Sequence, residues 1–210
     1  LGFGITVSTT YEQPYLLARK FTTLDHLTKG RIAWNVVTSQ LESAARNLGL
    51  EKQMDHDERY DRADEFLMLS YKLWQSSWES DAVKRDKQAG IYTDPDKVHP
   101  VGHNGRWFTV PDAHLSEPSP QRTPVIFQAG GSPRGIDFAA RHAEVVFVAG
   151  LDAQGVRRQV SAIKARAAAY GRCPEALRFI SAITVITGKN DDEARKSMRN
   201  VVTFMTYRAL

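Results

Sequence analysis

The sequence is poor in cysteine and has no long apolar run, and both absences narrow the classes of protein that it encodes. Cys173 is the one cysteine among 210 residues, which excludes an internal disulfide framework and a zinc site built from cysteines. No apolar run approaches the ~20 residues that a membrane-spanning helix needs, and no stretch has the pattern of a signal peptide. We therefore expect a cytoplasmic protein without a membrane partner.

Dense clusters of basic residues are also absent. Lys and Arg total 28 and Asp and Glu total 24, which gives a net charge of +4. The basic and acidic residues are interspersed along the chain. A basic face that binds nucleic acid is thus not indicated. A metal site is not indicated either, because no second histidine lies four residues after His56 in the run His56-Asp57-Glu58.

Both ends of the chain fall inside expected secondary structure. The sequence opens on LGFGI, without a methionine and within a strand pattern, and closes on TYRAL within a helix pattern. Natural termini usually lie outside such elements. We expect the chain to be an internal piece of a longer protein.

Strand and helix patterns alternate along most of the chain. We predict strands at 2–9, 31–38, 124–129, 144–149 and 178–187, and helices at 14–27, 40–48, 57–74, 133–142, 152–170 and 190–208. This order is typical of an α/β fold with a parallel sheet, either an open doubly wound sheet or a (β/α)8 barrel. The ends inside elements favour a barrel fragment. The run 31–38 is apolar enough to predict a strand buried on both faces.

Residues 76–118 depart from this alternation. They are rich in charges, prolines and glycines, and HNGRWFTV predicts a hairpin with Asn104-Gly105 at its turn. We interpret 76–118 as an insertion that carries function.

The stretch VIFQAGGSPRGIDF, residues 125–138, predicts a strand that runs into a helix. Ser132 stands at the N-cap position and Pro133 at the first helical position. The amino end of a helix binds anions, most often phosphate, and Arg134 could add positive charge. A plain strand-to-helix turn with a serine cap explains the same residues equally well.

Two other groups of polar residues stand where a ligand could reach them. His56 and Tyr60 are four residues apart and share a helix face, although His56 could be solvated and Tyr60 could cover the core. Asn35, Thr38 and Thr6 lie in or at the end of predicted strands, where ligands bind in both candidate folds. Structural hydrogen bonds or a simple turn are the alternatives for these three. No residue is singled out as catalytic.

Six stretches stand in a fixed order: STTYEQPYLLARKFTTLDHLTKGRIAWNVVTS, AARNLG, HDERYDRADEF, LWQSSWESDA, VHPVGHNGRWFTV and PVIFQAGGSPRGIDFAARHAEVVFV. Together they resemble the bacterial luciferase-like flavin monooxygenases, most of all the branch of nitrilotriacetate and dibenzothiophene-sulfone monooxygenases. The resemblance runs from about residue 1 to residue 190. It implies a (β/α)8 barrel with insertions, of which residues 1–210 are one part, lacking the first and last strands.

The resemblance also implies a chemistry and a site. Members of the family use O2 and reduced FMN, supplied by a separate NAD(P)H:flavin reductase, to oxidise small organic molecules with cleavage of C–S or C–N bonds or hydroxylation. It makes Ser132 a ligand of the FMN phosphate, Tyr60 and His56 ligands of the phosphate and ribityl region, and Thr6 and Asn35 neighbours of the flavin ring, with Thr38 less secure. We also expect a homo-oligomer.

The substrate that the resemblance favours is an organosulfur compound such as an aromatic sulfone. The stretches YEQPY, HDERYD and HLSEPSPQRTP match the sulfone branch best. Two alternatives stay open, a deazaflavin-dependent oxidoreductase on the same barrel and a truncated barrel that acts as a non-catalytic module.

Overall fold

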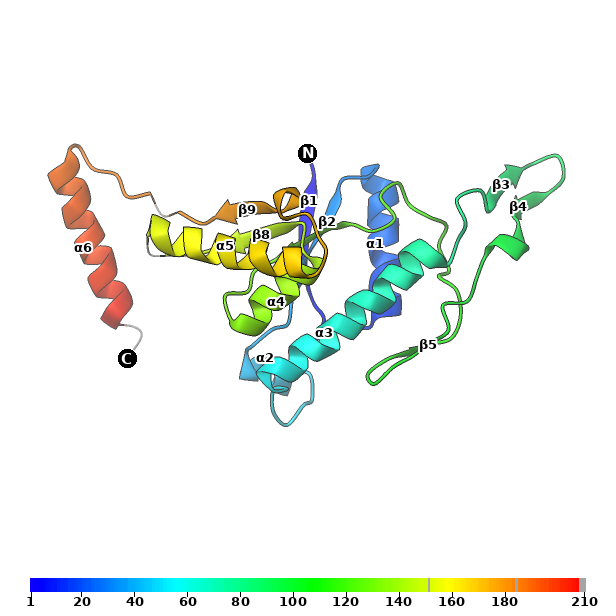
Figure 1. Ribbon diagram of the computed structural model, residues 1–210, viewed down its shortest axis with the longest axis horizontal. Coiled ribbons are helices and arrows are strands. Elements are labelled where there is room, and N and C mark those ends of the chain that lie inside the picture. Colours follow the sequence, from blue (N-terminus) through cyan, green and yellow to red (C-terminus); the bar gives the residue numbers. More distant parts are fainter. Residues whose placement is uncertain (151, 184, 208–210) are drawn as a thin grey trace. The chain divides into compact units, whose positions relative to one another are not determined.

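The computed structural model describes residues 1–150, 152–183 and 185–207. The chain divides into two compact units, Leu1–Ile180 and Ser181–Leu210. The first unit holds a five-stranded sheet, the helices that pack on it and an insertion with two small hairpins (Figure 1). Within the described residues, no helix is long and apolar enough to cross a membrane.

The main sheet has a spatial order that follows the sequence. It consists of β1 (Phe3–Ser8), β2 (Ile32–Val37), β7 (Val125–Gln128), β8 (Val145–Val148) and β9 (Arg178–Ser181), in that order. The pairs β1–β2, β2–β7 and β7–β8 are parallel. The order never reverses, as it would at the switch point of a doubly wound sheet. Consecutive strands of a barrel have this order, and the predicted α/β fold with a parallel sheet is confirmed.

The helices between these strands lie close to the predicted positions. They are α1 (Pro14–Thr28), α2 (Glu42–Asn47), α3 (His56–Tyr71), α4 (Pro133–His142) and α5 (Ala153–Ala169). A π-helical turn, Lys72–Ser76, continues α3 two residues past Trp74, where the predicted helix ends. Gly30 ends α1 with a φ of 77°, a left-handed conformation that glycine adopts without strain.

Trp34 on β2 is the centre of the core between the sheet and its helices. Its ring lies 5.8 Å from that of Phe21 on α1, 5.7 Å from Phe66 on α3 and 6.3 Å from Trp74. Its indole N–H donates to the carbonyl of Val7 at 3.0 Å. Because aromatic rings bury large apolar areas, this cluster fixes α1 and α3 against β1 and β2.

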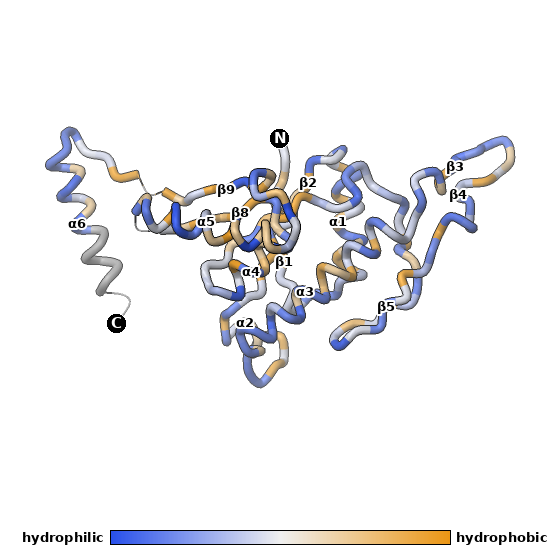
Figure 2. Tube along the Cα trace, viewed as in Figure 1, coloured by the Kyte–Doolittle hydropathy of each residue, from blue (hydrophilic) through white to orange (hydrophobic). Residues whose placement is uncertain are grey.

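The second face of the sheet is less buried than the first. Along β2, Ile32, Trp34 and Val36 are buried, whereas the residues between them are half-buried. The prediction of a strand buried on both faces is therefore wrong, because no described element covers the second face completely. The strand is nevertheless among the hydrophobic stretches of the chain, as is β8 (Figure 2).

The insertion at 76–118 holds the hairpins β3 (Val83–Asp86)–β4 (Ile91–Thr93) and β5 (His103–Asn104)–β6 (Thr109–Val110), with a 3₁₀ turn, Pro95–Lys97, between them. The hairpin predicted in HNGRWFTV is confirmed, but Asn104 lies in its strand and not at its turn, because Asn104 pairs with Thr109 and residues 105–108 form the loop.

A carboxylate on α3 explains the wider loop of this second hairpin. Glu65 accepts hydrogen bonds from the backbone N–H groups of Arg106 at 3.0 Å, Trp107 at 3.1 Å and Phe108 at 2.9 Å. His103 Nε2 lies 3.1 Å from the same carboxylate. Burial alone would raise the pKa of Glu65, but these hydrogen bonds outweigh it and hold the pKa below its usual value. The loop is thus shaped by a tertiary contact.

The second unit consists mainly of α6 (Asp191–Tyr207), at the predicted position. Its amino end has reciprocal caps, in which Glu193 N–H donates to Asn190 Oδ1 at 3.0 Å and Lys189 N–H donates to the Glu193 carboxylate at 2.6 Å. The strand predicted at 178–187 ends early, at Ser181, because no described strand pairs with the residues that follow, and Ile183 and Val185 are exposed.

Candidate functional site

The amino end of α4 has the cap that the sequence predicts. Ser132 is the N-cap residue, Pro133 is the first helical residue, and Ser132 Oγ accepts the N–H of Gly135 at 3.0 Å. The oxygen of Ser132 is used in this cap, but its hydroxyl proton stays available to an acceptor. This end of the helix therefore joins a free O–H donor to the positive end of the helix dipole.

Tyr60, from α3, reaches the same point. A Cβ placed on Gly135 would lie 2.8 Å from the Tyr60 hydroxyl, 3.0 Å from Gly130 Cα and 3.1 Å from Ser132 Oγ. A Cβ on Gly130 would lie 3.0 Å from the same Tyr60 hydroxyl. Only glycine leaves room at these two positions, and the hydroxyls of Tyr60 and Ser132 gather around Gly135.

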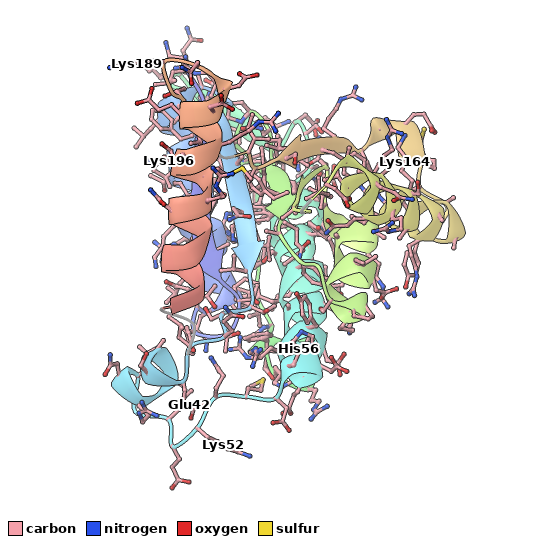
Figure 3. The ribbon with its side chains drawn as sticks, turned by 90° about the vertical axis from the view of Figure 1, so that its left-hand side faces the viewer. Glu42, Lys52, His56, Lys164, Lys189 and Lys196 are labelled. Atoms are coloured by element: carbon pink, nitrogen blue, oxygen red, sulfur yellow. The ribbon has the colours of Figure 1, made fainter. Side chains whose placement is uncertain are left out.

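His56 begins α3 and lies one helical turn before Tyr60. The two rings are 5.2 Å apart with an interplanar angle of 60°. His56 Nδ1 is 2.6 Å from Asp57 Oδ1, and about half of the His56 side chain is exposed. Figure 3 shows His56 at the amino end of α3, at the same end of the unit as Glu42. The structure therefore brings His56, Tyr60 and Ser132 together, although the sequence separates them by up to 76 positions.

A cleft of about 310 Å³ is lined by His56 and Tyr60, whereas Ser132 is not among its lining residues. It lies at the carboxyl ends of β2 and β7, where Thr38 and Gln128 line it, and α3 contributes His56, Arg59 and Tyr60. Ligands of parallel α/β sheets bind at the carboxyl ends of the strands. The cleft thus has the position of a ligand site in this fold.

Two polar atoms beside the cleft are buried and lack a partner within the described residues. They are Gln128 Oε1 and Arg59 Nε. Gln128 is 3% exposed and Arg59 is 8% exposed. Buried polar atoms normally have a hydrogen-bond partner. A ligand with both acceptors and donors would supply the missing partners.

Thr6 and Asn35 form a separate pair on the second face of the sheet. They are register partners in β1 and β2, and Asn35 Nδ2 donates to Thr6 Oγ1 at 3.0 Å. Thr6 is exposed, and Asn35 Oδ1 is buried without a partner in the described part of the chain. Neither residue lines the cleft, so the predicted site residues fall into two groups, one at the cleft and one within the strands.

Arg134 does not have the surroundings that its position in the sequence suggests. Its guanidinium donates to Asp64 at 2.6 Å and to Asp61 at 2.8 Å, both on α3, and lies 3.4 Å from Asp137. Burial lowers the pKa of Arg134, but the hydrogen bonds to these carboxylates outweigh it and raise the pKa above its usual value. Arg134 therefore fastens α4 to α3, and its charge is already neutralised.

Sequence reasoning missed three residues of the site. Gln128 had a signal, because it is a polar residue at the end of the apolar run VIFQ. Gly135 and Arg59 had none, because the approach of the Tyr60 hydroxyl and the position of the guanidinium depend on how α3 packs against the sheet. In the described ranges, no group of three or more His, Cys, Asp or Glu side chains could hold a metal ion.

A protein-family model described as luciferase-like monooxygenase matches residues 1–210 of the chain. The chain belongs to this family. The resemblance that the six stretches indicate is therefore confirmed, and the cleft at the carboxyl ends of the strands belongs to a luciferase-like monooxygenase domain.

Three curated relatives illustrate the range of this family. A long-chain alkane monooxygenase from Geobacillus thermodenitrificans (strain NG80-2) is 56% identical over 100% of this chain and 47% of its own length. A dimethyl-sulfide monooxygenase from Hyphomicrobium sulfonivorans is 52% identical, over 97% of this chain and 42% of its own. A dibenzothiophene-sulfone monooxygenase from Rhodococcus erythropolis is 45% identical, over 94% and 44%.

The fold agrees with a solved structure of the same kind. A crystal structure of a long-chain alkane monooxygenase matches with a TM-score of 0.88 at 57% identity, over 95% of this chain and 46% of the other. The chain spans about half the length of the curated relatives that it matches.

Proposed function

We propose that the protein to which this chain belongs is a monooxygenase that uses reduced FMN and O2 to oxidise a small organic substrate. One observation carries the proposal: the hydroxyls of Ser132 and Tyr60 gather at the capped amino end of α4, in a luciferase-like monooxygenase chain. Such an end attracts phosphate.

The residues at the cleft and at the amino end of α4 fit the phosphate and ribityl parts of FMN. Ser132 and Tyr60 have O–H groups that would donate to the phosphate, and His56 would contact the phosphate or ribityl region. Gln128 Oε1 is buried without a described partner and would accept a hydrogen bond from a ribityl hydroxyl. Because Gly130 and Gly135 have no Cβ, the Tyr60 hydroxyl can approach the amino end of α4, where the phosphate would bind.

Thr6 and Asn35 would contact the flavin ring. They lie on neighbouring strands, and the unpaired Asn35 Oδ1 faces no described donor. Two groups of ligands, one at the cleft and one on the sheet, suit an elongated cofactor better than a compact one. Thr38, which lines the cleft, would contact the part between them.

The cofactor and the residues of this chain would have different roles in the reaction. When bound, reduced FMN supplies the electrons that activate O2. The residues of this chain would hold the phosphate at one end, orient the ring against the sheet and exclude water from the reacting atoms. A separate NAD(P)H:flavin reductase would supply reduced FMN, and we also propose a homo-oligomer.

We further propose an organosulfur substrate, such as an aromatic sulfone, with cleavage of a C–S or C–N bond. Two relatives are named for the oxidation of dimethyl sulfide and dibenzothiophene sulfone. A relative named for long-chain alkanes is also 56% identical, so an alkane is the main competing substrate.

The test uses the complete protein. Fluorescence titration with FMN, in the oxidised and reduced states, measures flavin affinity, and O2 uptake in the presence of a flavin reductase measures turnover with sulfones, sulfides, alkanes and aminopolycarboxylates. We expect FMN binding and substrate-dependent O2 uptake that is largest with a sulfone. Absence of flavin binding in both redox states would contradict the proposal, and hydride transfer from a deazaflavin without O2 uptake would replace it.

A further inference from the structure

Arg59 is a buried cation beside the cleft. It belongs to α3, lies between His56 and Tyr60 in the cleft wall and is 8% exposed. One nitrogen, Nη1, donates to the carbonyl of Met54, and Nε has no partner within the described residues. The Met54 carbonyl carries no net charge, so the described part of the chain leaves this guanidinium unneutralised.

Arg134, which reaches α3 from α4, has the partners that Arg59 lacks. Its guanidinium donates to the carboxylates of Asp61 and Asp64. Burying a charge without an opposite charge costs several kcal/mol. We therefore expect Arg59 to face an anion when the site is filled.

The position of Arg59 indicates which anion this is. The cleft that it lines also contains His56 and Tyr60, and the Tyr60 hydroxyl lies beside the capped end of α4. The charged group of FMN at physiological pH is its phosphate, and arginine binds phosphate through charge-assisted hydrogen bonds. A neutral hydroxyl, as in riboflavin, would leave the Arg59 charge uncompensated.

We propose that Arg59 neutralises the phosphate of the bound flavin and makes the cleft select FMN over riboflavin. The inference rests on the proposed function, because it assumes that a flavin occupies the cleft. It adds a residue that the sequence did not indicate and a full positive charge beside the partial charge at the amino end of α4. Ser132 and Tyr60 are neutral donors, so these charges are what would distinguish a phosphate from a hydroxyl.

The experiment compares Arg59→Gln and Arg59→Lys with the unaltered complete protein. Arg46→Gln is the matched control, because Arg46 is an exposed arginine on α2 and its loss changes the net charge equally. Fluorescence titrations give the Kd for FMN and for riboflavin, and thermal unfolding with and without inorganic phosphate gives the melting temperature.

We expect Arg59→Gln to raise the Kd for FMN roughly 10- to 100-fold, the range for a lost charge-assisted hydrogen bond, and to leave the Kd for riboflavin within about twofold. Arg59→Lys should retain most of the preference for FMN, and Arg46→Gln all of it. Inorganic phosphate should raise the melting temperature of the unaltered protein and of Arg46→Gln more than that of Arg59→Gln.

Three results would overturn the inference. An equal loss for FMN and riboflavin would make Arg59 a structural residue, paired with an acid elsewhere in the complete protein. An unchanged Kd for FMN would exclude contact with the phosphate. Stabilisation by inorganic phosphate that depends on Arg59, without any change in the preference between flavins, would indicate a free-phosphate site.

The proposed function and this inference fail in different ways. If the unaltered protein binds neither flavin, the flavin assignment itself is contradicted. If the unaltered protein binds FMN but Arg59→Gln keeps the preference for FMN, only the role of Arg59 is wrong. Should Arg59→Gln not fold, Arg59→Met decides the matter, because it also removes the charge but keeps an unbranched side chain, and an unchanged ratio of the two Kd values in that variant would exclude the contact.

Discussion

The amino ends of α4 and α5 are built alike, and only one of them suits a phosphate. Each helix follows a strand of the main sheet, and each cap accepts the N–H of a glycine three residues later, Ser132 from Gly135 at 3.0 Å and Asp152 from Gly155 at 2.6 Å. By sequence pattern alone, both are helix starts that could bind an anion.

The two ends differ in charge and in what lies around them. Asp152 carries a negative charge at neutral pH and would repel a phosphate, whereas Ser132 is neutral and keeps a hydroxyl proton to donate. A Cβ on Gly135 would meet the Tyr60 hydroxyl of another helix, whereas a Cβ on Gly155 would meet the Asp152 carboxylate at 3.2 Å. A capped helix end therefore becomes a candidate site through a neutral cap and a donor brought by a second element.

The largest expected effect comes from giving α4 the cap of α5. Ser132→Asp should keep the cap, because aspartate is as good an N-cap as serine, but should place a carboxylate against the FMN phosphate. Like charges in contact cost several kcal/mol, so we expect the Kd for FMN to rise about 100-fold or more. The Kd for riboflavin should change by less than about threefold, since riboflavin lacks the phosphate.

Asp152→Ser is the reciprocal control for this change. It gives α5 the cap of α4 and should leave the Kd for FMN unaltered, as measured by the same fluorescence titration. If Ser132→Asp bound FMN as well as the unaltered protein does, the phosphate would not lie at α4, and the comparison of the two helix ends would lose its meaning.

The second effect comes from filling the space at Gly135. Gly135→Ala would place a methyl group 2.8 Å from the Tyr60 hydroxyl and 3.0 Å from the backbone of Gly130. Overpacking of this kind costs about 1–3 kcal/mol, and we expect the Kd for FMN to rise about 10-fold as Tyr60 is displaced.

Gly155→Ala is the matched control, because its nearest neighbour is a movable side chain. Alanine is the better helix residue by up to about 1 kcal/mol, so this variant should be as stable as the unaltered protein or slightly more so. Urea unfolding measures both variants. Equal stability of Gly135→Ala and Gly155→Ala would show that α3 and α4 are not tightly packed at this point.

Local patterns predicted much of the fold, and the reasons are visible in particular residues. Hydrophobic spacing located the helices, Lys29-Gly30 marked the end of α1, and Ser132-Pro133 marked the start of α4, since each signal acts within one turn of chain. The position of the turn between β5 and β6 was predicted wrongly. Glu65, about forty positions earlier, accepts hydrogen bonds from three N–H groups of that loop. Contacts at such separations leave no trace in local propensity.

Some residues of the candidate site were likewise predicted from local patterns, and others depend on tertiary packing. Ser132, His56 and Tyr60 were predicted, and the structure places Tyr60 beside both of the others. Arg134 and Arg59 could not be told apart by sequence, because both are arginines near polar motifs. Within the described part of the chain, packing gives Arg134 three aspartates and gives Arg59 a carbonyl and an Nε without a partner. The sequence thus locates charged groups, and the tertiary structure decides which of them are already neutralised.

The third effect comes from replacing Arg134, the second residue of α4. The second residue of α5 is Gln154, so the substitution is Arg134→Gln. Arg134→Gln removes the charge that Asp61 and Asp64 face, and lost hydrogen bonds to charged groups should reduce the free energy of unfolding by about 2 kcal/mol at pH 7. Affinity for FMN should fall only a few-fold, because Arg134 is fastened to α3 and positions the helix end.

The loss in Arg134→Gln should also depend on pH. Burial raises the pKa of Asp64, but hydrogen bonds from His142 and Arg134 outweigh it and hold the folded-state pKa below its usual value of 3.8. A depressed carboxyl pKa stabilises the fold above the unfolded-state pKa, and the contribution disappears as pH falls through the folded-state pKa. The difference between the two proteins in urea unfolding should therefore shrink below about pH 4, and a constant difference would contradict the role of Asp64.

The smallest expected effects come from removing each cap. Ser132→Ala and Asp152→Ala should each reduce the free energy of unfolding by about 1 kcal/mol, so stability does not distinguish them. Affinity does, because only Ser132→Ala removes a donor to the phosphate, and a neutral hydrogen bond of about 1 kcal/mol corresponds to roughly a fivefold rise in the Kd for FMN.

Ser132→Gly separates the role of Ser132 as a helix cap from its role as a donor to the phosphate, since glycine costs only a few tenths of a kcal/mol at an N-cap. A glycine variant that is nearly as stable as the unaltered protein but binds FMN as weakly as Ser132→Ala would show that the hydroxyl acts on the ligand directly. Full affinity in Ser132→Gly would instead reduce Ser132 to a cap, the role that Asp152 has in α5.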